Sequence, residues 1–483
     1  MTSTLPSATD LPAAAAPAPS RPPLPATAPT PVPDPQGAAR AYELDRAHVF
    51  HSWSAQAALT PFVPMGAQGS WVWDGEGRPF LDFSSQLVFT NIGFGHPKVV
   101  AAIAEQAALL ATIAPQHANA ARSEAARLIV ERAPGQHFSH VFFTNGGADA
   151  IENAVRMARL HTGRRKVLAR YRSYHGNTTT AINLTGDPRR WPNDYGAEGV
   201  VHFFGPYLYR SVFHATTEEE ETARALEHLE QTIQLEGPTT IAAVVLESIP
   251  GTAGIMVPTP AYLRGVRDLC DRYGIVWIAD EVMSGFGRAG RWFACELAGE
   301  GAEPDLVTFA KGVNSGYVPL GGVLVSRPVY ETFARRPFPG GLTYSGHPLA
   351  CAAAVATITA MADEGVVENA DRLGREVFGP ELAALAARHP IVGEVRGVGA
   401  FWALELVRDR ETREPLVPFN ATGEANAPMA AFSGACRRLG LMPFVNGNRT
   451  HVVPALTITD EEARYGLALL DAALTEVEAT LPS

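Results

Sequence analysis

The sequence predicts an α/β protein: a mostly parallel sheet flanked by helices forms the main domain, with a smaller α+β domain beside it. Along the middle of the chain, short β-rich runs alternate with helical stretches such as Thr259–Tyr273, the order that parallel sheets require. The chain has 483 residues and is 46% hydrophobic, which suffices for a large core. Near the C-terminus the pattern changes. Gly393–Val407, a strand over Thr450–Ile458 and a helix from Asp460 predict the second domain.

The elements divide into four expected regions. Residues 1–37 are dominated by Ala, Pro, Thr and Ser and cannot bury enough surface to offset their ordering entropy, so we expect a disordered tail. Residues 38–95, with a strand–turn–strand over Trp71–Asp82, are expected to join the small domain, which residues 353–483 complete. The large domain is expected over residues 96–352. Its β-rich runs are Val141–Phe143, Val167–Ala169, Ile241–Leu246, Ile275–Ala279, Leu306–Phe309 and Val323–Val325.

Composition argues against several classes of protein. The formal net charge of -11 disfavours a nucleic-acid binder. No apolar run reaches the length of about 18 residues that a membrane span needs. The four cysteines form no C-x-x-C pair, so we expect no metal site and a reduced, cytoplasmic chain. They are Cys270, Cys295, Cys351 and Cys436.

Three expected strands end in polar residues, Glu247, Asp280 and Lys311. Ligands of open α/β sheets bind beyond the carboxyl ends of strands. Lys311 is either a surface lysine or a buried amine whose pKa is lowered by desolvation, as Schiff-base chemistry needs. Asp280 either caps a turn or forms a salt bridge to a pyridinium nitrogen.

Two further loops follow strands. In Thr144–Ala150, two glycines lead into a helix, so backbone N–H groups and the helix dipole favour an anion; the alternative is an ordinary glycine turn. In Tyr171–Asn177, Tyr174 and His175 are either residues that contact a flat cofactor or ordinary core residues. Thr343 lies in a turn that offers hydroxyl and amide donors.

The order of these motifs resembles one family. The chain reads T-N-G-G-A-D-A-I-E-N-A, Y-H-G, A-D-E-V-M-S-G-F-G-R, F-A-K-G and T-Y-S-G-H-P in succession. This resembles the class III (ω-) aminotransferases, pyridoxal 5'-phosphate (PLP) enzymes of fold type I, from about Val72 to about Asp460. The resemblance implies a PLP-transferase fold with a seven-stranded sheet, and a homodimer.

The resemblance also implies roles for single residues. Lys311 carries PLP as a Schiff base, the internal aldimine, and moves the substrate proton, while Asp280 pairs with the pyridinium nitrogen. The implied cofactor contacts are Gly146, Gly147 and Ala148 at the phosphate, Tyr174 and Val282 on the ring faces, His175 behind the ring, Glu247 near the ring hydroxyl, and Thr343 at the partner subunit's phosphate. The family's phosphate motif often reads S-G-S-E-A or S-G-T-E-A. Here Gly146–Ala150 lacks one hydroxyl donor, so we expect altered cofactor affinity.

The substrate pocket is less well defined by the sequence. Its early segment resembles Ser84–Phe89, with Val88 and Phe89 as candidate pocket residues; Trp53 and Tyr174 are expected to border the same pocket. Many amine transaminases carry a large aromatic residue at the position of Val88, where valine leaves more room or serves only the core. Arg449 either binds a substrate carboxylate or is a surface-loop arginine.

The segment Phe203–Arg210 is similar to one in ω-amino-acid:pyruvate and taurine-type transaminases. We therefore expect an ω-amine or ω-amino acid donor and a 2-oxo acid acceptor, pyruvate, in a ping-pong reaction. A PLP-dependent decarboxylase or aminomutase on the same scaffold is the alternative. A descendant that no longer binds the cofactor is a third possibility, which the presence of both Lys311 and Asp280 disfavours.

Overall fold

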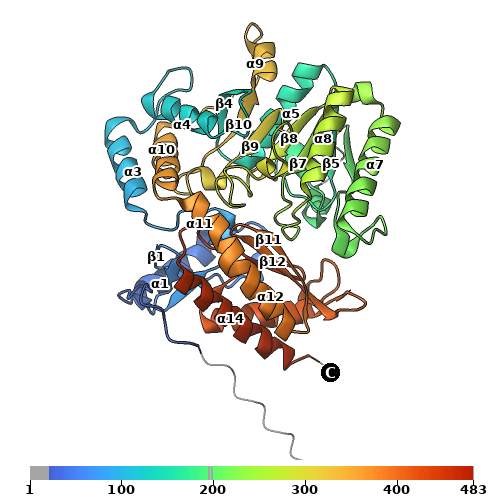
Figure 1. Ribbon diagram of the computed structural model, residues 1–483. Coiled ribbons are helices and arrows are strands. Elements are labelled where there is room, and N and C mark those ends of the chain that lie inside the picture. Colours follow the sequence, from blue (N-terminus) through green and yellow to red (C-terminus); the bar gives the residue numbers. More distant parts are fainter. Residues whose placement is uncertain (1–20, 194–195, 197–198, 482–483) are drawn as a thin grey trace, which may run out of the picture.

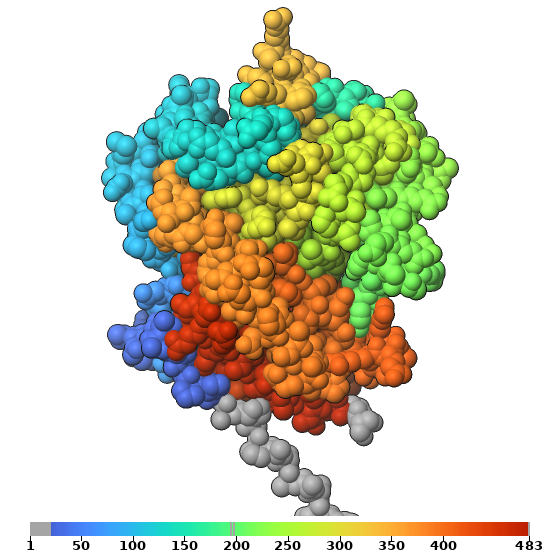
Figure 2. Space-filling view, in the orientation of Figure 1, coloured from blue at the N-terminus to red at the C-terminus, as the bar shows by residue number. Residues whose placement is uncertain are grey.

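The computed structural model describes residues 21–193, 196 and 199–481. The chain forms two lobes: the middle of the sequence builds one, and the two ends of the sequence build the other (Figure 1). In the space-filling view, the blue N-terminal and the orange-to-red C-terminal segments lie together in the lower lobe (Figure 2). The predicted α/β fold is confirmed.

The upper lobe contains a seven-stranded sheet with the order β4-β10-β9-β8-β7-β5-β6. β10 runs antiparallel to both of its neighbours and the other pairs are parallel, so the sheet is mostly parallel as predicted. The strands are β4 (Phe138–Thr144), β5 (Lys166–Arg170), β6 (Val200–Phe203), β7 (Ile241–Glu247), β8 (Val276–Asp280), β9 (Leu306–Phe309) and β10 (Gly321–Ser326). The sequence pattern missed β6, because this short edge strand is only half-buried and lacks the apolar run of the central strands.

Helices cover both faces of this sheet because its central strands are apolar throughout; every residue of β7 is buried. One face packs against α5 (Gly147–Thr162), α6 (Thr179–Leu184) and α9 (Arg327–Phe333). The other face packs against α7 (Glu218–Glu236) and α8 (Pro260–Tyr273). Near β4 and β10 lie α3 (Pro97–Leu110), α4 (Ala120–Glu131) and α10 (Pro348–Asp363), with apolar side chains in the core that continues into the lower lobe.

The lower lobe joins the two ends of the chain in its sheets. Leu81 of β3 pairs with Leu441 of β14 in parallel register. The first sheet contains β1 (Gly66–Gln68), β2 (Trp71–Trp73), β3 (Pro79–Asp82) and β14 (Leu441–Met442). The second contains β11 (Val392–Val398), β12 (Phe401–Asp409), β16 (Arg449–Val452) and β15 (Phe444–Asn446), with β13 (Glu414–Pro415) beside β12. The helices of this lobe are α1 (Pro35–His48), α11 (Val366–Leu373), α12 (Gly379–Arg388), α13 (Ala427–Leu439) and α14 (Asp460–Glu478).

Two features bear on the predicted region boundaries, which stay predictions. α10 runs across the boundary set at residue 352. Of the predicted tail, residues 1–20 lie outside the described residues. Further along it, Arg21 donates to the Tyr465 hydroxyl and to the Pro79 carbonyl, both at 2.8 Å.

Within the described residues, no single helix has the length and hydropathy of a membrane span. One bent pair of helices, Pro348–Asp363 with Val366–Arg388, meets those criteria jointly.

Candidate active site

The polar strand ends predicted from the sequence lie side by side. In the register of the sheet, Glu247 is opposite Asp280, and Asp280 is opposite Thr308. Lys311 is the second residue after the end of β9, and its backbone has the left-handed conformation with φ 45°. We call Glu247, Asp280 and Lys311 the floor of the site. Because parallel strands end at the same edge, three separate strands bring these three side chains together.

Asp280 is buried and held by three hydrogen-bond donors. His175 Nδ1 lies 2.7 Å from Asp280 Oδ2. The other oxygen, Oδ1, accepts from the Val282 N–H at 3.1 Å and the Thr308 hydroxyl at 3.4 Å. Burial lowers the pKa of His175, but the hydrogen bond and the negative charge of Asp280 outweigh it, so the pKa of His175 is raised. The second ring nitrogen, Nε2, is buried without a hydrogen-bond partner among the described residues.

Glu247 connects the floor to two loops. Its Oε1 accepts from the Tyr174 N–H at 2.9 Å, and its Oε2 accepts from the Gly251 N–H at 2.8 Å. Burial raises the pKa of Glu247, and the charge of Asp280 raises it further. Glu247 therefore positions the loop that carries Tyr174 relative to the strand ends.

Lys311 is the only lysine at this edge, and no hydrogen bond or ion pair from the described residues reaches its Nζ atom. Burial lowers the pKa of Lys311 from 10.5 to about 8, although the charges of Asp280 and Glu247 oppose this shift. The positive charge of Arg189 lowers the pKa of Lys311 further. About a tenth of this amine is therefore neutral at pH 7, far more than for a lysine in water, and the neutral form is a base and a nucleophile.

The start of α5 presents backbone N–H donors of the kind that bind anions. Gly146 is the extended residue before this helix, and Gly147 begins it. A Cβ atom on Gly147 would lie 2.9 Å from Val282 Cγ1, so only glycine fits against this side chain. The first N–H groups of a helix have no partner within the helix and point at its N-terminal end. We call Gly146, Gly147 and Ala148 the phosphate cup; Val282, which lies against Gly147, is the second residue after Asp280 in the chain.

Next to the floor, where the Tyr174 N–H donates to Glu247, aromatic and cationic side chains form what we call the mouth: Trp53, Tyr174 and Arg189. The rings of Trp53 and Tyr174 meet edge to face with centroids 6.1 Å apart. The Arg189 guanidinium carbon lies 3.7 Å from the centroid of the Tyr174 ring and 5.8 Å from that of Trp53. Sequence reasoning missed Arg189. The only signal was the pair of arginines in Gly186-Asp187-Pro188-Arg189-Arg190, after the helix that follows the Tyr174 loop.

The early pocket segment adopts a strained backbone around α2 (Ser85–Val88). Ser85, Gln86 and Val88 have φ values of 43°, 61° and 60°, which are unfavourable for residues with side chains. Val88 is 1% exposed and lies in an apolar cluster with Ile249, Ile255 and Phe401, among others. Phe89 lies against Gly316, where a Cβ atom would come within 2.4 Å of the Phe89 ring.

Arg288 holds this strained segment in place. Its buried guanidinium donates to the Ser85 hydroxyl at 3.2 Å and to the Asn91 carbonyl oxygen at 3.0 Å. It also donates to the backbone carbonyls of Ala400 and Pro454 in the lower lobe. Burial lowers the pKa of Arg288 to about 9. One side chain thus links the α2 segment to both lobes.

Arg449 lies at the boundary of the two lobes, beside Gly254. It is largely buried, its Nε atom has no hydrogen-bond partner among the described residues, and burial lowers its pKa. Its neighbourhood contains a network centred on Glu405, which accepts from the Tyr207 hydroxyl and Arg210 Nε at 2.5 Å each and from Arg396 at 3.0 Å. Arg449 is therefore not a free surface arginine.

Thr343 lies apart from the floor in this chain. It is exposed, in the loop that follows α9, and α9 projects from the upper lobe (Figure 1). The neighbouring Ser345 hydroxyl anchors this loop by donating to the Phe143 carbonyl at 2.8 Å. Among the described residues, no hydrogen bond or ion pair connects Thr343 to the phosphate cup.

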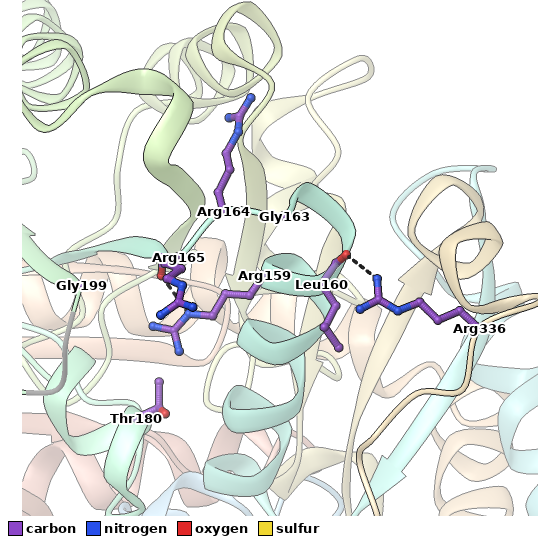
Figure 3. Close-up of a pocket in the computed structure, with 8 residues that line it drawn as sticks. All are labelled: Arg159, Leu160, Gly163, Arg164, Arg165, Thr180, Gly199 and Arg336. Atoms are coloured by element: carbon purple, nitrogen blue, oxygen red, sulfur yellow. Dashed lines mark hydrogen bonds between the residues drawn. The ribbon is translucent and has the colours of Figure 1, made fainter.

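A pocket of about 720 Å³ lies away from the site, at the C-terminal end of α5 (Figure 3). Four arginines line it, but three of them are engaged locally; one of these, Arg336, donates to the Leu160 carbonyl at 3.4 Å. Arg164 donates to four backbone carbonyls, including that of Gly274 at 2.8 Å, and Arg159 donates to the Arg165 carbonyl at 2.8 Å. The 16 residues of α5 separate this pocket from the phosphate cup, a length of about 24 Å.

Comparison with known proteins agrees with this geometry. The model of the family described as aminotransferase class-III matches residues 53–474. The taurine–pyruvate aminotransferase of Rhodobacter capsulatus is 33% identical over 471 residues, which are 92% of this chain and 99% of that protein.

Two solved structures share the whole fold. The taurine:2-oxoglutarate aminotransferase of Bifidobacterium kashiwanohense, in complex with PLP and glutamate, has a TM-score of 0.88 at 40% identity and covers 92% of this chain and 99% of its own. An (S)-enantioselective ω-transaminase from Thermomicrobium roseum has a TM-score of 0.85 at 37% identity. The match covers 91% of this chain and 99% of that one. The chain therefore belongs to the class-III aminotransferases and is a PLP-dependent transaminase.

Proposed function

We propose that this transaminase moves an amino group from an ω-amino acid or ω-amine to pyruvate in a ping-pong reaction. The observation that carries the proposal is the buried Lys311 amine, whose pKa is lowered to about 8, beside the carboxylate of Asp280. The taurine–pyruvate aminotransferase named above supports the choice of donor and acceptor, because it matches nearly end to end. The similar segment Phe203–Arg210 supports it as well.

The residues of the site fit PLP. The phosphate cup offers backbone N–H donors at the start of a helix, and the space beside Gly146 is open, since a Cβ atom there would meet no atom within 4 Å. Asp280, held by His175 and the Val282 N–H, is suited to pair with a ring nitrogen. Tyr174 and Val282 are proposed for the two ring faces, and Glu247 for the hydrogen-bond network near the ring hydroxyl. When bound, PLP supplies an electron-accepting ring that stabilises negative charge on the substrate carbon.

Lys311 is proposed to hold the cofactor and then to act as the base. Its neutral Nζ atom takes the proton from the carbon that bears the amino group and later returns a proton to the cofactor side. Burial favours the neutral amine, and the charge of Asp280 limits how far the pKa falls. His175 orients Asp280 by a hydrogen bond of 2.7 Å. The pair thereby fixes the position of this side chain at the ring end of the site.

The remaining assignments are made on position. We propose that Trp53, Phe89 and Tyr174 border the substrate, and that Val88 supports this wall from the core beneath it. Arg449 is proposed to bind the carboxylate of the 2-oxo acid, since its Nε atom is buried and unpaired among the described residues. Thr343, on an exposed loop, is proposed to reach the partner's phosphate cup in a homodimer. All four cysteines are free and buried, which suits a cytoplasmic enzyme.

A half-reaction screen tests the proposal. The purified holoenzyme is mixed with β-alanine, taurine, putrescine or n-propylamine without an acceptor, and the visible absorbance of the lysine-bound cofactor is followed. We expect at least one ω-amino acid to bleach this absorbance and pyruvate to restore it. Restoration by 2-oxoglutarate alone would contradict pyruvate as acceptor, and release of carbon dioxide in place of amino transfer would favour a decarboxylase.

A further inference from the structure

Arg189, one of the three residues of the mouth, is held by Asp187, two residues before it in the chain. Its Nε atom lies 3.1 Å and 3.0 Å from the two carboxylate oxygens of Asp187, and its Nη2 atom also contacts this carboxylate. The guanidinium plane is stacked 3.7 Å from the Tyr174 ring. Two independent contacts therefore fix both the position and the orientation of this cation.

One edge of this guanidinium remains available. A guanidinium presents five N–H donors, and Asp187 engages the Nε–Nη2 edge. No hydrogen bond from the described residues reaches Nη1, and the side chain is 27% exposed. An incoming acid group can therefore dock on the Nη1 edge in bidentate geometry while Asp187 still holds the opposite edge.

The position of Arg189 relative to Lys311 distinguishes it from Arg449. Arg189 lies over the ring of Tyr174, whose N–H donates to Glu247 of the floor, so a single residue separates this cation from the strand ends. The surroundings of Arg449 are instead the charged groups between the two lobes, Glu405 and Arg396 foremost. The two arginines therefore lie in different electrostatic surroundings, and a substrate whose amine faces Lys311 finds a cation at the mouth.

We propose that Arg189 is an acid-group subsite, which selects donors that carry a carboxylate or sulfonate a few carbons from their amine. This inference rests on the proposed function and adds to it the residue that binds the acid group of the donor. Tyr174 stacks on the guanidinium and Asp187 orients it, so the subsite exists before the substrate arrives. The plain alternative is that Arg189 only braces the Tyr174 ring.

The first test separates these two roles by comparing donors. Arg189→Gln and Arg189→Lys are assayed at saturating pyruvate with β-alanine, taurine and n-propylamine, the last having no acid group. For Arg189→Gln we expect KM for the two acids to rise about 10- to 100-fold with little change in kcat, and n-propylamine to change less than about 3-fold. Arg189→Lys should restore part of the loss, since it keeps the charge without the planar fork.

Arg165→Gln is the matched control, since it removes one exposed arginine at the far end of α5. This variant should leave KM and kcat for all three donors unchanged. Equal losses for acids and for n-propylamine in Arg189→Gln would show a bracing role and overturn the proposal. A wild-type enzyme that accepts n-propylamine but neither acid would instead contradict the proposed donor class, and this result appears without any variant.

The second test needs no turnover. Binding of propanoate and of ethanesulfonate, which carry the acid group but no amine, is measured by calorimetry on the holoenzyme. We expect the Kd of both to rise at least about 10-fold in Arg189→Gln and to stay the same in Arg165→Gln. If both acids bind Arg189→Gln as tightly as wild type, the acid subsite lies elsewhere, whatever the kinetics show.

Discussion

The floor and the mouth of the site are built from different kinds of structure. Glu247, Asp280 and Lys311 come from the ends of three neighbouring strands, where sheet register fixes their spacing. Trp53 and Tyr174 come from loops and Arg189 from the short 3-10 helix Pro188–Asn193, and the three meet through ring and guanidinium contacts. A one-residue register shift would destroy the floor, whereas the mouth can change one side chain at a time.

This difference assigns chemistry and selection to separate parts. Groups that every substrate needs lie where the backbone ladder holds them rigidly. Groups that distinguish one substrate from another lie on loops, where substitution does not disturb the sheet. Changes to the floor should therefore affect all donors alike, and changes to the mouth should affect donors unequally.

The largest effect is expected at the floor, for Lys311→Ala. Without the amine, the site has no base at the substrate carbon and no nucleophile for the cofactor. We expect kcat to fall at least about 10³-fold for β-alanine and for n-propylamine alike, measured by pyruvate-dependent turnover. Circular dichroism should show an intact fold. A loss confined to acid-bearing donors would break the distinction between floor and mouth.

A smaller but still large effect is expected from Arg288→Leu, measured as the free energy of unfolding. The change leaves the Asn91 oxygen and the Ala400 and Pro454 carbonyls without their buried donor. We expect a loss of about 2–4 kcal/mol, since each unsatisfied buried group costs about 1–3 kcal/mol and removal of the buried guanidinium offsets part of this. Arg291→Leu, which removes a half-exposed arginine three residues away, should change stability by less than about 0.5 kcal/mol. Equal stability of the two variants would contradict the bracing role of Arg288.

The floor was largely predictable from the sequence, because polar residues directly after apolar strands mark the carboxyl edge of a parallel sheet. Glu247, Asp280 and Lys311 could be named on this basis, and the helix after Gly146-Gly147 indicated the phosphate cup. The strands were predicted to within a few residues, apart from β6, whose half-buried edge position gives no distinctive pattern.

The mouth was much less predictable. Trp53 and Tyr174 were named through resemblance, but nothing in the local pattern around Arg189 indicates that it stacks on Tyr174. The positive φ values of Ser85, Gln86 and Val88 also run against the preferences of these residues. Their conformation is imposed by tertiary contacts such as those of Arg288, and local propensity cannot report a contact between distant segments.

A pH titration of cofactor capture measures the state of the floor directly. Only the neutral amine of Lys311 attacks an aldehyde, and burial lowers its pKa from 10.5 to about 8. When cofactor-free enzyme is mixed with PLP, we expect the rate of capture to rise about tenfold per pH unit below pH 8 and to level off above it. Asp280 favours the ammonium form, so Asp280→Asn should move the midpoint to lower pH. A rate that keeps rising towards pH 10 would show an amine exposed to water.

The smallest effect is expected at the phosphate cup, where Ala148→Ser supplies the hydroxyl that related motifs carry. Ala148 lies in the first turn of α5, where a hydroxyl can donate to an anion at the helix end. One added hydrogen bond contributes about 0.5–1.5 kcal/mol, so the Kd for PLP should fall about 2- to 10-fold in a fluorescence titration of the cofactor-free protein. Ala148→Val adds bulk without a donor and should not tighten binding. Because this change leaves the mouth untouched, the ratio of the KM for β-alanine to the KM for n-propylamine should stay constant. A shift in that ratio would mean that the phosphate cup and the mouth are coupled.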